Sequence, residues 1–177
     1  MRAYAVSAML TASTSRSNTD GRADAMSRTD RGRVAQAAES SGIRARFVDV
    51  ENVSELDHAF KTLRESPAMA VQVIADPFLG GHLDKIVACA KDLRVPAIYP
   101  FRNGVEAGGL ISYAADYRDL FRRAGGYIDR IVKGTPPDAL PLEFPAKFEL
   151  LLNAKTAQAL GLTIPPTLLA RADEVIE

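Results

Sequence analysis

The sequence predicts an α/β fold, in which a mostly parallel sheet carries helices on both faces and so forms three layers. Short apolar segments typical of buried strands alternate along the chain with longer segments whose apolar residues recur at helical spacing. Helices that connect successive strands in this way favour a parallel sheet covered on both faces. The prediction therefore rests on the order of the elements as well as on their patterns.

The first strand is expected at residues 3–10. A weak signal peptide is the alternative, but Ser7 and Thr11 interrupt a short and only weakly apolar stretch, which favours the strand. Residues 11–30 are rich in Ser, Thr, Asp, Arg and Gly and lack apolar periodicity, so they predict a flexible loop.

Helix and strand signals follow one another after that loop. Asp30 is expected to cap a helix that stops at Gly42. Residues 43–50 alternate as a strand does, and Ser54 opens a capping-box pattern for the next helix. Further strands are expected at 70–75, 96–99 and 110–113, with amphipathic helices that begin near residues 83 and 117.

The helix that begins near residue 117 and the segments after it have a different character. Gly125 and Gly126 cost this helix about 1 kcal/mol each, so they predict close packing against a neighbouring element. Prolines make residues 140–145 extended. Residues 148–152 then form a strand candidate, and Asn153 caps a short helix. We therefore divide the chain into a lobe, 1–147, and a C-terminal β-α crossover segment, 148–177, that docks elsewhere.

The composition excludes several classes of function. Lysine plus arginine and aspartate plus glutamate each number 22, so the net charge is zero, whereas nucleic-acid binders normally carry a basic excess. No apolar run approaches the roughly 20 residues of a membrane span. The single cysteine, Cys89, excludes an intrachain disulfide and is expected to be a small buried hydrophobe. Neither His58 nor His82 shows metal-ligand spacing, so we expect no metal, no cofactor and no catalytic residue.

Candidate ligand-binding residues lie where the predicted strands end, because parallel sheets bind ligands beyond the carboxyl ends of their strands. These residues are Asp76, Phe78, Tyr99, Phe101, Arg102, Ser112 and Tyr113.

Two of these candidates have alternative roles that the sequence leaves open. Asp76 could pair with a ligand ammonium or cap the following helix. Arg102 could clamp a ligand carboxylate or pair with Glu106. Among the aromatic candidates, Phe101 is the better one to stack on a ligand, and Tyr99 is expected to pack in the core.

An ordered set of motifs resembles the carboxyl half of the ABC-transporter substrate-binding proteins. The set contains Tyr99-Pro100-Phe101-Arg102 and the stretches 105–113, 119–124, 131–134, 140–141, 147–150, 153–161 and 164–176. The resemblance covers about Asp30 to the end. It implies a periplasmic-binding-protein-like lobe, a solute bound between two hinged lobes, an ABC permease as partner, a periplasmic location and no enzymatic activity.

The chain departs from this family in two respects. A complete member carries another α/β lobe before the matched region, so segment 148–177 would pack on a lobe that this chain does not contain. Family members that bind amino acids have small polar or acidic residues where Phe101 and Arg102 stand. This departure weakens the case for an amino-acid ligand. The expected solute is a small organic molecule such as an aromatic compound or an amino or carboxylic acid. The N-terminus gives no convincing signal peptide, which leaves a cytoplasmic location open.

The C-terminal segment also predicts self-association. Its apolar residues, left uncovered, would favour a homodimer built from these segments. They are Phe148, Leu150, Leu152, Ala157, Leu160, Leu162, Leu168 and Leu169. Two other functions stay open: a remnant that dimerises but binds nothing, and an enzyme that uses Asp76 or Cys89.

Overall fold

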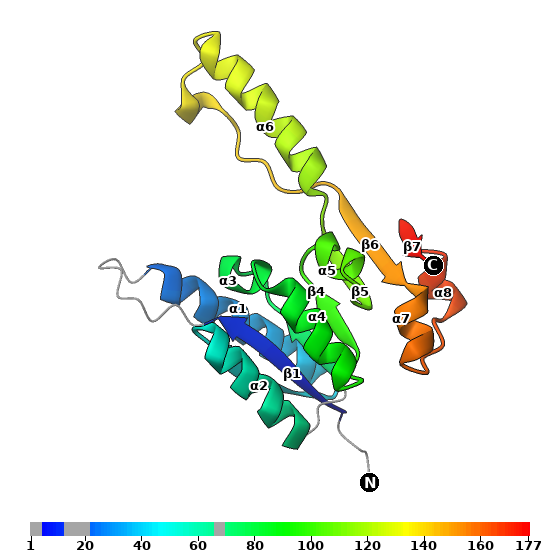
Figure 1. Cartoon of the computed structure of the whole chain (residues 1–177). Helices are drawn as coiled ribbons and strands as arrows, with labels where there is room; N and C mark the ends of the chain where they lie inside the picture. The colour runs from blue at the N-terminus through cyan, green and yellow to red at the C-terminus, as the bar shows by residue number, and fades with distance from the viewer. Residues whose placement is uncertain (1–4, 13–21, 66–69) are drawn as a thin grey trace.

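Seven strands form one sheet in a computed structural model that describes residues 5–12, 22–65 and 70–177, with side chains from Arg31 onward (Figure 1). The strand order is β2-β1-β3-β4-β5-β6-β7, and all neighbours are parallel except β5 and β6. The strands are β1 Ala5–Ala12, β2 Ile43–Val50, β3 Ala70–Val73, β4 Ala97–Tyr99, β5 Ile111–Ala115, β6 Phe148–Asn153 and β7 Glu174–Ile176. The predicted mostly parallel α/β sheet is confirmed.

Helices fill the connections between strands. They are α1 Arg22–Ser40, α2 Val53–Glu65, α3 Pro77–Gly80, α4 Leu83–Asp92, α5 Arg102–Glu106, α6 Tyr117–Val132, α7 Ala154–Ala159 and α8 Pro166–Leu169. A 3-10 turn, Pro137–Ala139, follows α6. Within the described ranges, no helix has both the length and the apolar character that crossing a membrane requires.

The main core lies on one face of the sheet, beneath α2 and α4. Leu56 of α2 and Ile86 of α4 belong to the same buried cluster as Val71 and Val73 of β3. Because side chains alternate along a strand, Gln72 and its neighbours in register face the other way. They line a hollow together with Arg33 and Val34 of α1, so α1 covers the opposite face (Figure 1).

The N-terminal third differs from the sequence prediction. Strand β1 runs to Ala12, and α1 already begins at Arg22, so the second half of the expected loop, 11–30, is helical. Asp30 lies inside α1 and does not cap it. The segment is rich in alanine, arginine and other good helix formers, which act even where apolar periodicity is weak. Residues 13–21 lie outside the described residues. Gly42 does end the helix, with a φ of +69°.

Helix α2 begins two residues before the predicted start. Asn52 is the capping residue, because its Oδ1 accepts a hydrogen bond from the Glu55 backbone N–H at 3.0 Å. The Glu55 carboxylate reaches back to the backbone N–H of Glu51 at 2.7 Å. The capping box therefore involves Asn52 and Glu55, and Ser54 lies in the first turn of the helix.

The C-terminal segment continues the sheet of its own chain. Strand β6 pairs antiparallel with β5, where Ser112 stands opposite Leu151, and β7 then pairs parallel with β6. The backbone N–H of Leu150 donates to Asp173 Oδ2 at 2.8 Å, which fixes the start of β7 beside β6. The expected boundary at 147/148 therefore lies between two strands of one sheet, and the final segment ends as a strand after the short helix α8.

Residues 116–147, which we call the arm, leave the sheet and return to it. Helix α6 projects away from the domain, and the following segment runs back beside it (Figure 1). Tyr127 donates to the carbonyl of Pro141, and Arg123 pairs with Glu143, so the two limbs of the arm contact each other. Large apolar side chains on the arm are exposed, namely Tyr117, Phe121, Ile128, Ile131, Val132, Leu142 and Phe144.

The prediction that Gly125 and Gly126 serve close packing is wrong for this chain. A Cβ atom built at either position meets nothing within 4 Å. The apolar face of α6, which was expected to pack, has no covering element among the described residues.

Candidate functional site

A hollow of about 250 Å³ lies at the carboxyl edge of the sheet, between the start of α5, strands β5 and β6, and the start of α6. We call it the Ser112 hollow. It is lined by Phe101, Arg102, Asn103, Ser112, Ala114, Ala115, Asp116, Tyr117, Arg118, Glu149 and Leu151. Three of the seven predicted ligand-binding residues, Phe101, Arg102 and Ser112, therefore meet in one place.

Ser112 lies at the bottom of this hollow. Strand alternation directs Ser112 and Ala114 to the same face, and the register sets Ser112 beside Tyr99 and opposite Leu151. Ser112 is 1% exposed, and its Oγ has no hydrogen-bond partner. A buried hydroxyl without a partner costs about 1–3 kcal/mol, so a polar group placed in the hollow would relieve that cost.

Two aromatic rings form another part of the wall. The rings of Phe101 and Tyr117 lie with centroids 5.6 Å apart and planes tilted by 56°. This is a normal geometry for an attractive aromatic pair. Tyr117 is 46% exposed, so its ring has a free surface on which a flat solute could pack.

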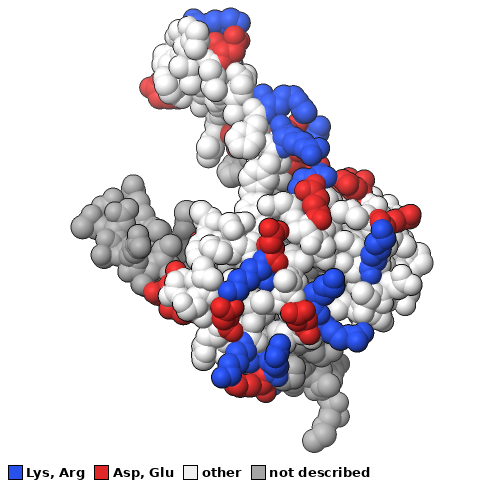
Figure 2. Space-filling model, viewed as in Figure 1, with Lys and Arg blue, Asp and Glu red and all other residues white. Residues whose placement is uncertain are grey.

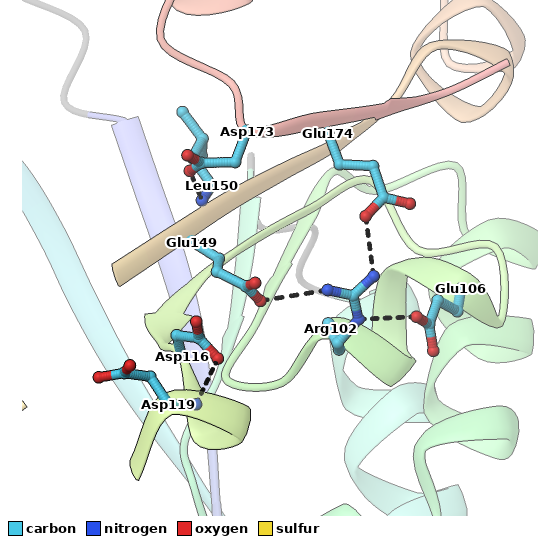
Figure 3. Close-up of polar contacts among 8 residues, drawn as sticks. All are labelled: Arg102, Glu106, Asp116, Asp119, Glu149, Leu150, Asp173 and Glu174. Atoms are coloured by element: carbon cyan, nitrogen blue, oxygen red, sulfur yellow. Dashed lines mark hydrogen bonds and ion pairs between the residues drawn. The ribbon is translucent and has the colours of Figure 1, made fainter. Parts of the chain in front are cut away.

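Arg102 binds three carboxylates from three different elements (Figure 3). Its Nε contacts Glu106 of α5 at 2.8 Å, Nη1 contacts Glu149 of β6 at 3.2 Å, and Nη2 contacts Glu174 of β7 at 2.8 Å. Hydrogen bonds to Glu106 and then to Glu174 raise the pKa of Arg102 above its ordinary value. Of the two roles considered for Arg102 from the sequence, the ion pair with Glu106 is thus present. The carboxylates of Glu149 and Glu174 also bind the same guanidinium group.

The start of α6 is already supplied with negative charge (Figure 3). Asp116 Oδ1 accepts from the backbone N–H of Asp119 at 3.0 Å, which caps the helix. Asp119 is largely buried, and its carboxylate faces Arg122 at 3.2 Å and Lys147 at 3.5 Å. These carboxylates satisfy the positive end of the helix dipole.

Asp76 caps α3. Its Oδ1 accepts from the backbone N–H groups of Phe78 at 2.7 Å and Leu79 at 3.3 Å. The Phe78 ring packs on His82 with centroids 4.5 Å apart, and the Phe78 carbonyl lies 2.8 Å from His82 Nδ1. Neither Asp76 nor Phe78 lines the Ser112 hollow.

Tyr113 lies on the opposite face of β5. It is 59% exposed and stacks on Phe148 at 5.7 Å. Together with Ile98 and Tyr117 it lines a second hollow of about 450 Å³ on the side of α1. The sheet therefore separates Tyr113 from Ser112, because neighbouring residues of a strand point to opposite faces.

Tyr99 packs in the core, as the sequence favoured. It is 2% exposed, and burial raises the pKa of its hydroxyl. Gly104 and Gly109 both lie against the Tyr99 ring, and a Cβ at either position would overlap it. The ring thus holds the turn that presents Phe101 and Arg102.

The sequence prediction missed part of this site. Asp116 and Tyr117 follow β5, but the strand was expected to end at Tyr113 and in fact ends at Ala115. The same strand-end rule, applied two residues later, would have found them. Glu149 and Glu174 carried no local signal, because they reach Arg102 only through the pairing of β6 and β7.

Charged side chains elsewhere form no single-sign patch on the face shown in Figure 2, where basic and acidic groups alternate. His58 is exposed, and burial, followed by the charge of Asp57, raises the pKa of the Cys89 thiol. Among the residues whose placement is described, no group of three or more His, Cys, Asp or Glu side chains could hold a metal ion.

Comparison with known proteins gives one family. A model of the family described as ABC transporter substrate binding protein matches residues 22–176. A comparison with the curated proteins finds no match.

Solved structures show the same fold. An ABC domain from Streptococcus pneumonia in complex with L-Trp is 26% identical and superposes with a TM-score of 0.81, over 97% of this chain and 56% of that one. A conserved domain protein from Vibrio cholerae is 20% identical and superposes with a TM-score of 0.80, over 96% of this chain and 54% of that one. The third structure is the ligand-free, open form of a substrate binding protein with adhesive properties from Clostridium difficile. It is 17% identical and superposes with a TM-score of 0.65, over 97% of this chain and 54% of that one. The chain therefore spans just over half the length of these structures.

Proposed function

The chain belongs to the family of ABC transporter substrate binding proteins, and from this premise we propose that it binds a small organic solute for an ABC uptake system. The Ser112 hollow supports this proposal most directly, because a buried hydroxyl without a partner and a pair of aromatic rings line the same hollow. Ligand sites commonly combine apolar and aromatic walls with a few fixed polar groups. Delivery to a permease and a periplasmic location are parts of the same proposal.

An aromatic solute fits this hollow best. Phe101 and Tyr117 supply ring surface, and the similar Streptococcus structure holds L-Trp. A carboxylate on the solute finds less support, because Arg102 already binds three carboxylates. The hollow has about 250 Å³, which is below the usual range for a complete site, so we expect weak binding by this chain alone.

We propose that the chain is not an enzyme. The family is a substrate-binding class. The two residues considered for catalysis argue in the same direction. The Asp76 carboxylate is engaged as a helix cap, and the raised pKa of Cys89 keeps the thiol protonated, whereas a nucleophilic cysteine needs a lowered pKa.

We also propose that the chain forms a homodimer, but through the arm. Leu150, Leu151 and Leu152 of β6 are buried within their own domain, so less of segment 148–177 is available for association than the sequence predicts. The exposed apolar side chains of the arm are more numerous, and Phe121 and Phe144 are each 75% exposed. A contiguous apolar surface of this kind favours association. A dimer that binds no solute is the competing function.

Direct titration tests the proposed function. The chain has no tryptophan, so excitation at the long-wavelength edge of the indole band follows the fluorescence of L-Trp as a ligand without exciting the five tyrosines of the protein. We expect saturable binding in the millimolar range, weakened at least five-fold in Phe101→Ala and in Tyr117→Ala. The matched control Phe144→Ala, on the arm, should bind as the parent chain does. Absence of saturation by any aromatic solute at millimolar concentration would favour the non-binding dimer.

A further inference from the structure

We propose that the Ser112 hollow selects aromatic solutes that carry a positively charged nitrogen and disfavours those whose only charged group is a carboxylate. This inference rests on the proposed function, since it assigns a substrate class to the same hollow. It reverses the role first considered for Arg102, which was to attract a carboxylate.

The charge around the hollow is negative although the whole chain is neutral. Arg102 brings one positive charge and holds three carboxylates, and Arg118 and Asp116 on the rim offset each other. Four carboxylates thus stand against two guanidinium groups. The four carboxylates are those of Glu106, Asp116, Glu149 and Glu174. The two guanidinium groups are those of Arg102 and Arg118. Asp119 beside the rim adds a fifth carboxylate, and its partners Arg122 and Lys147 add two cationic groups. An excess of one negative charge remains, and it attracts a cation and repels an anion.

Two of these carboxylates line the hollow and keep acceptor capacity. Glu149 uses Oε2 for Arg102, and Asp116 uses Oδ1 for the helix cap. The second oxygen of each makes no hydrogen bond or ion pair with the described residues. A carboxylate can accept several hydrogen bonds, so both groups can still receive the N–H donors of an ammonium.

Ser112 provides separate evidence that a polar group of a ligand binds in the hollow. Its hydroxyl is enclosed, lacks a partner and belongs to the wall that also contains Glu149. An ammonium group has three donors and no acceptor. One donor can therefore reach Ser112 Oγ while the others reach the carboxylates, whereas an anion in the same position would meet Glu149.

Two features of the hollow favour the opposite charge, and both are weaker. The N-terminus of α6 would attract an anion, but the Asp116 cap and the buried Asp119 already satisfy it. Arg118 is exposed to solvent, which screens its charge as it screens those of Glu106 and Glu174, whereas Asp116 and Glu149 are only partly exposed. The rings of Phe101 and Tyr117 add to the preference for a cation, because aromatic faces attract positive charge.

Three ligands that share the indole ring and differ in charge test the selection. Tryptamine is cationic, tryptophol is neutral and indole-3-acetate is anionic. Because the chain has no tryptophan, each can be titrated by its own fluorescence. We expect tryptamine to bind at least ten-fold more tightly than indole-3-acetate, with tryptophol between them.

Variants then assign the preference to this hollow. Glu149→Gln should reduce the ratio of amine to acid affinity at least three-fold, and Ser112→Ala should weaken tryptamine at least three-fold. The matched control Glu143→Gln, on the arm beside Arg123, should change neither. Circular dichroism verifies that each variant is folded. The affinities of Glu149→Gln and Ser112→Ala are interpreted separately, so that each variant is a test by itself.

The outcomes separate this inference from the function on which it rests. Equal or tighter binding of indole-3-acetate would overturn the selection and leave aromatic-solute binding standing. A preference for tryptamine that is unchanged in both Glu149→Gln and Ser112→Ala would overturn the assignment to this hollow. Absence of binding by all three ligands at millimolar concentration would overturn the proposed function itself.

Discussion

Gly109 leaves less room for a side chain than any other described glycine. A methyl group built there would lie 2.5 Å from the carbonyl oxygen of Gly104 and 2.8 Å from Cδ2 of the Tyr99 ring, with another ring atom closer still. Real Cβ atoms do not approach other heavy atoms so closely, so Gly109→Ala requires a shift of the Tyr99 ring or of the backbone. Tyr99 is 2% exposed and has nowhere to move without displacing the core.

The cost of this substitution follows from overpacking. Extra methyl groups in a packed core typically destabilise by about 1–3 kcal/mol, and the upper end applies here because one of the obstructing atoms belongs to the backbone. For a domain of this length, about 3 kcal/mol corresponds to a fall in Tm of roughly 6–12 °C. Since Tyr99 precedes Phe101 and Arg102, we also expect weaker solute binding in the same variant.

Gly125 provides the matched control. It lies in the interior of α6, and an added Cβ meets nothing within 4 Å. Gly125→Ala should therefore stabilise the chain by about 0.5–1 kcal/mol, through helix propensity alone. Urea unfolding followed by circular dichroism compares the two variants. Equal stability of Gly109→Ala and the parent chain, or equal loss in both variants, would refute the reasoning.

Four further predictions follow from individual contacts. Arg102→Gln should lower the free energy of unfolding by about 1–2 kcal/mol, a modest value because the ion pairs are partly exposed, and the loss should shrink in 1 M salt; a loss independent of salt would contradict an electrostatic origin. Asp76→Ala should cost about 1 kcal/mol through loss of the α3 cap, measured by urea unfolding, and no loss would show that the cap is dispensable. Cys89 has a pKa raised above 9.0 in the folded chain, so iodoacetamide should modify it more slowly than in urea at pH 8.5, and its contribution to stability should decline as the pH rises above about 9; equal rates in both states would contradict this. Phe121→Ser combined with Phe144→Ser should shift light scattering from dimer to monomer without lowering Tm, and an unchanged dimer would exclude the arm as the interface.

Sequence patterns predicted those elements whose signal is local. Apolar residues at helical spacing predicted the helices, and in α2 the four residues with this spacing, Leu56, Ala59, Phe60 and Leu63, are all buried. The strand at 43–50 and the cap at Asn153 are likewise predicted from a few neighbouring residues, and both are confirmed. The period of apolar residues is sufficient wherever an element buries one face against the core.

The failures share a different cause. The apolar face of α6 has the same period as a core helix, but nothing among the described residues covers it, so periodicity alone could not tell a packed helix from one that awaits a partner. For α1 the error was reversed, because helix propensity formed a helix where apolar periodicity was weak.

The candidate site could be predicted only in part. Phe101 and Arg102 follow the end of β4, as the general rule for parallel sheets predicts. Ser112 joins them because it lies beside Tyr99 in the register of β4 and β5, although β5 continues to Ala115. Two of the three carboxylates on Arg102, those of Glu149 and Glu174, depend on β6 and β7 pairing across a long separation, which has no local signature. Tyr113 lies outside the Ser112 hollow because a neighbour of Ser112 in sequence must lie on the other face of the sheet.

The arm has an architectural consequence of its own. Strands β5 and β6 pair as an antiparallel hairpin does, and the backbone N–H of Asp116 donates to the carbonyl of Lys147 at 3.0 Å, so both ends of residues 116–147 are held together at one point. The arm is in effect a very long hairpin loop. Compared with a loop of about four residues, its closure costs only about 2 kcal/mol more, at about 0.6 kcal/mol for each doubling of length. The sheet thus tolerates changes in the length and sequence of this loop beyond residues 116–118, which line the Ser112 hollow. The outer surfaces of the arm can diversify while Ser112 and its neighbours stay in register.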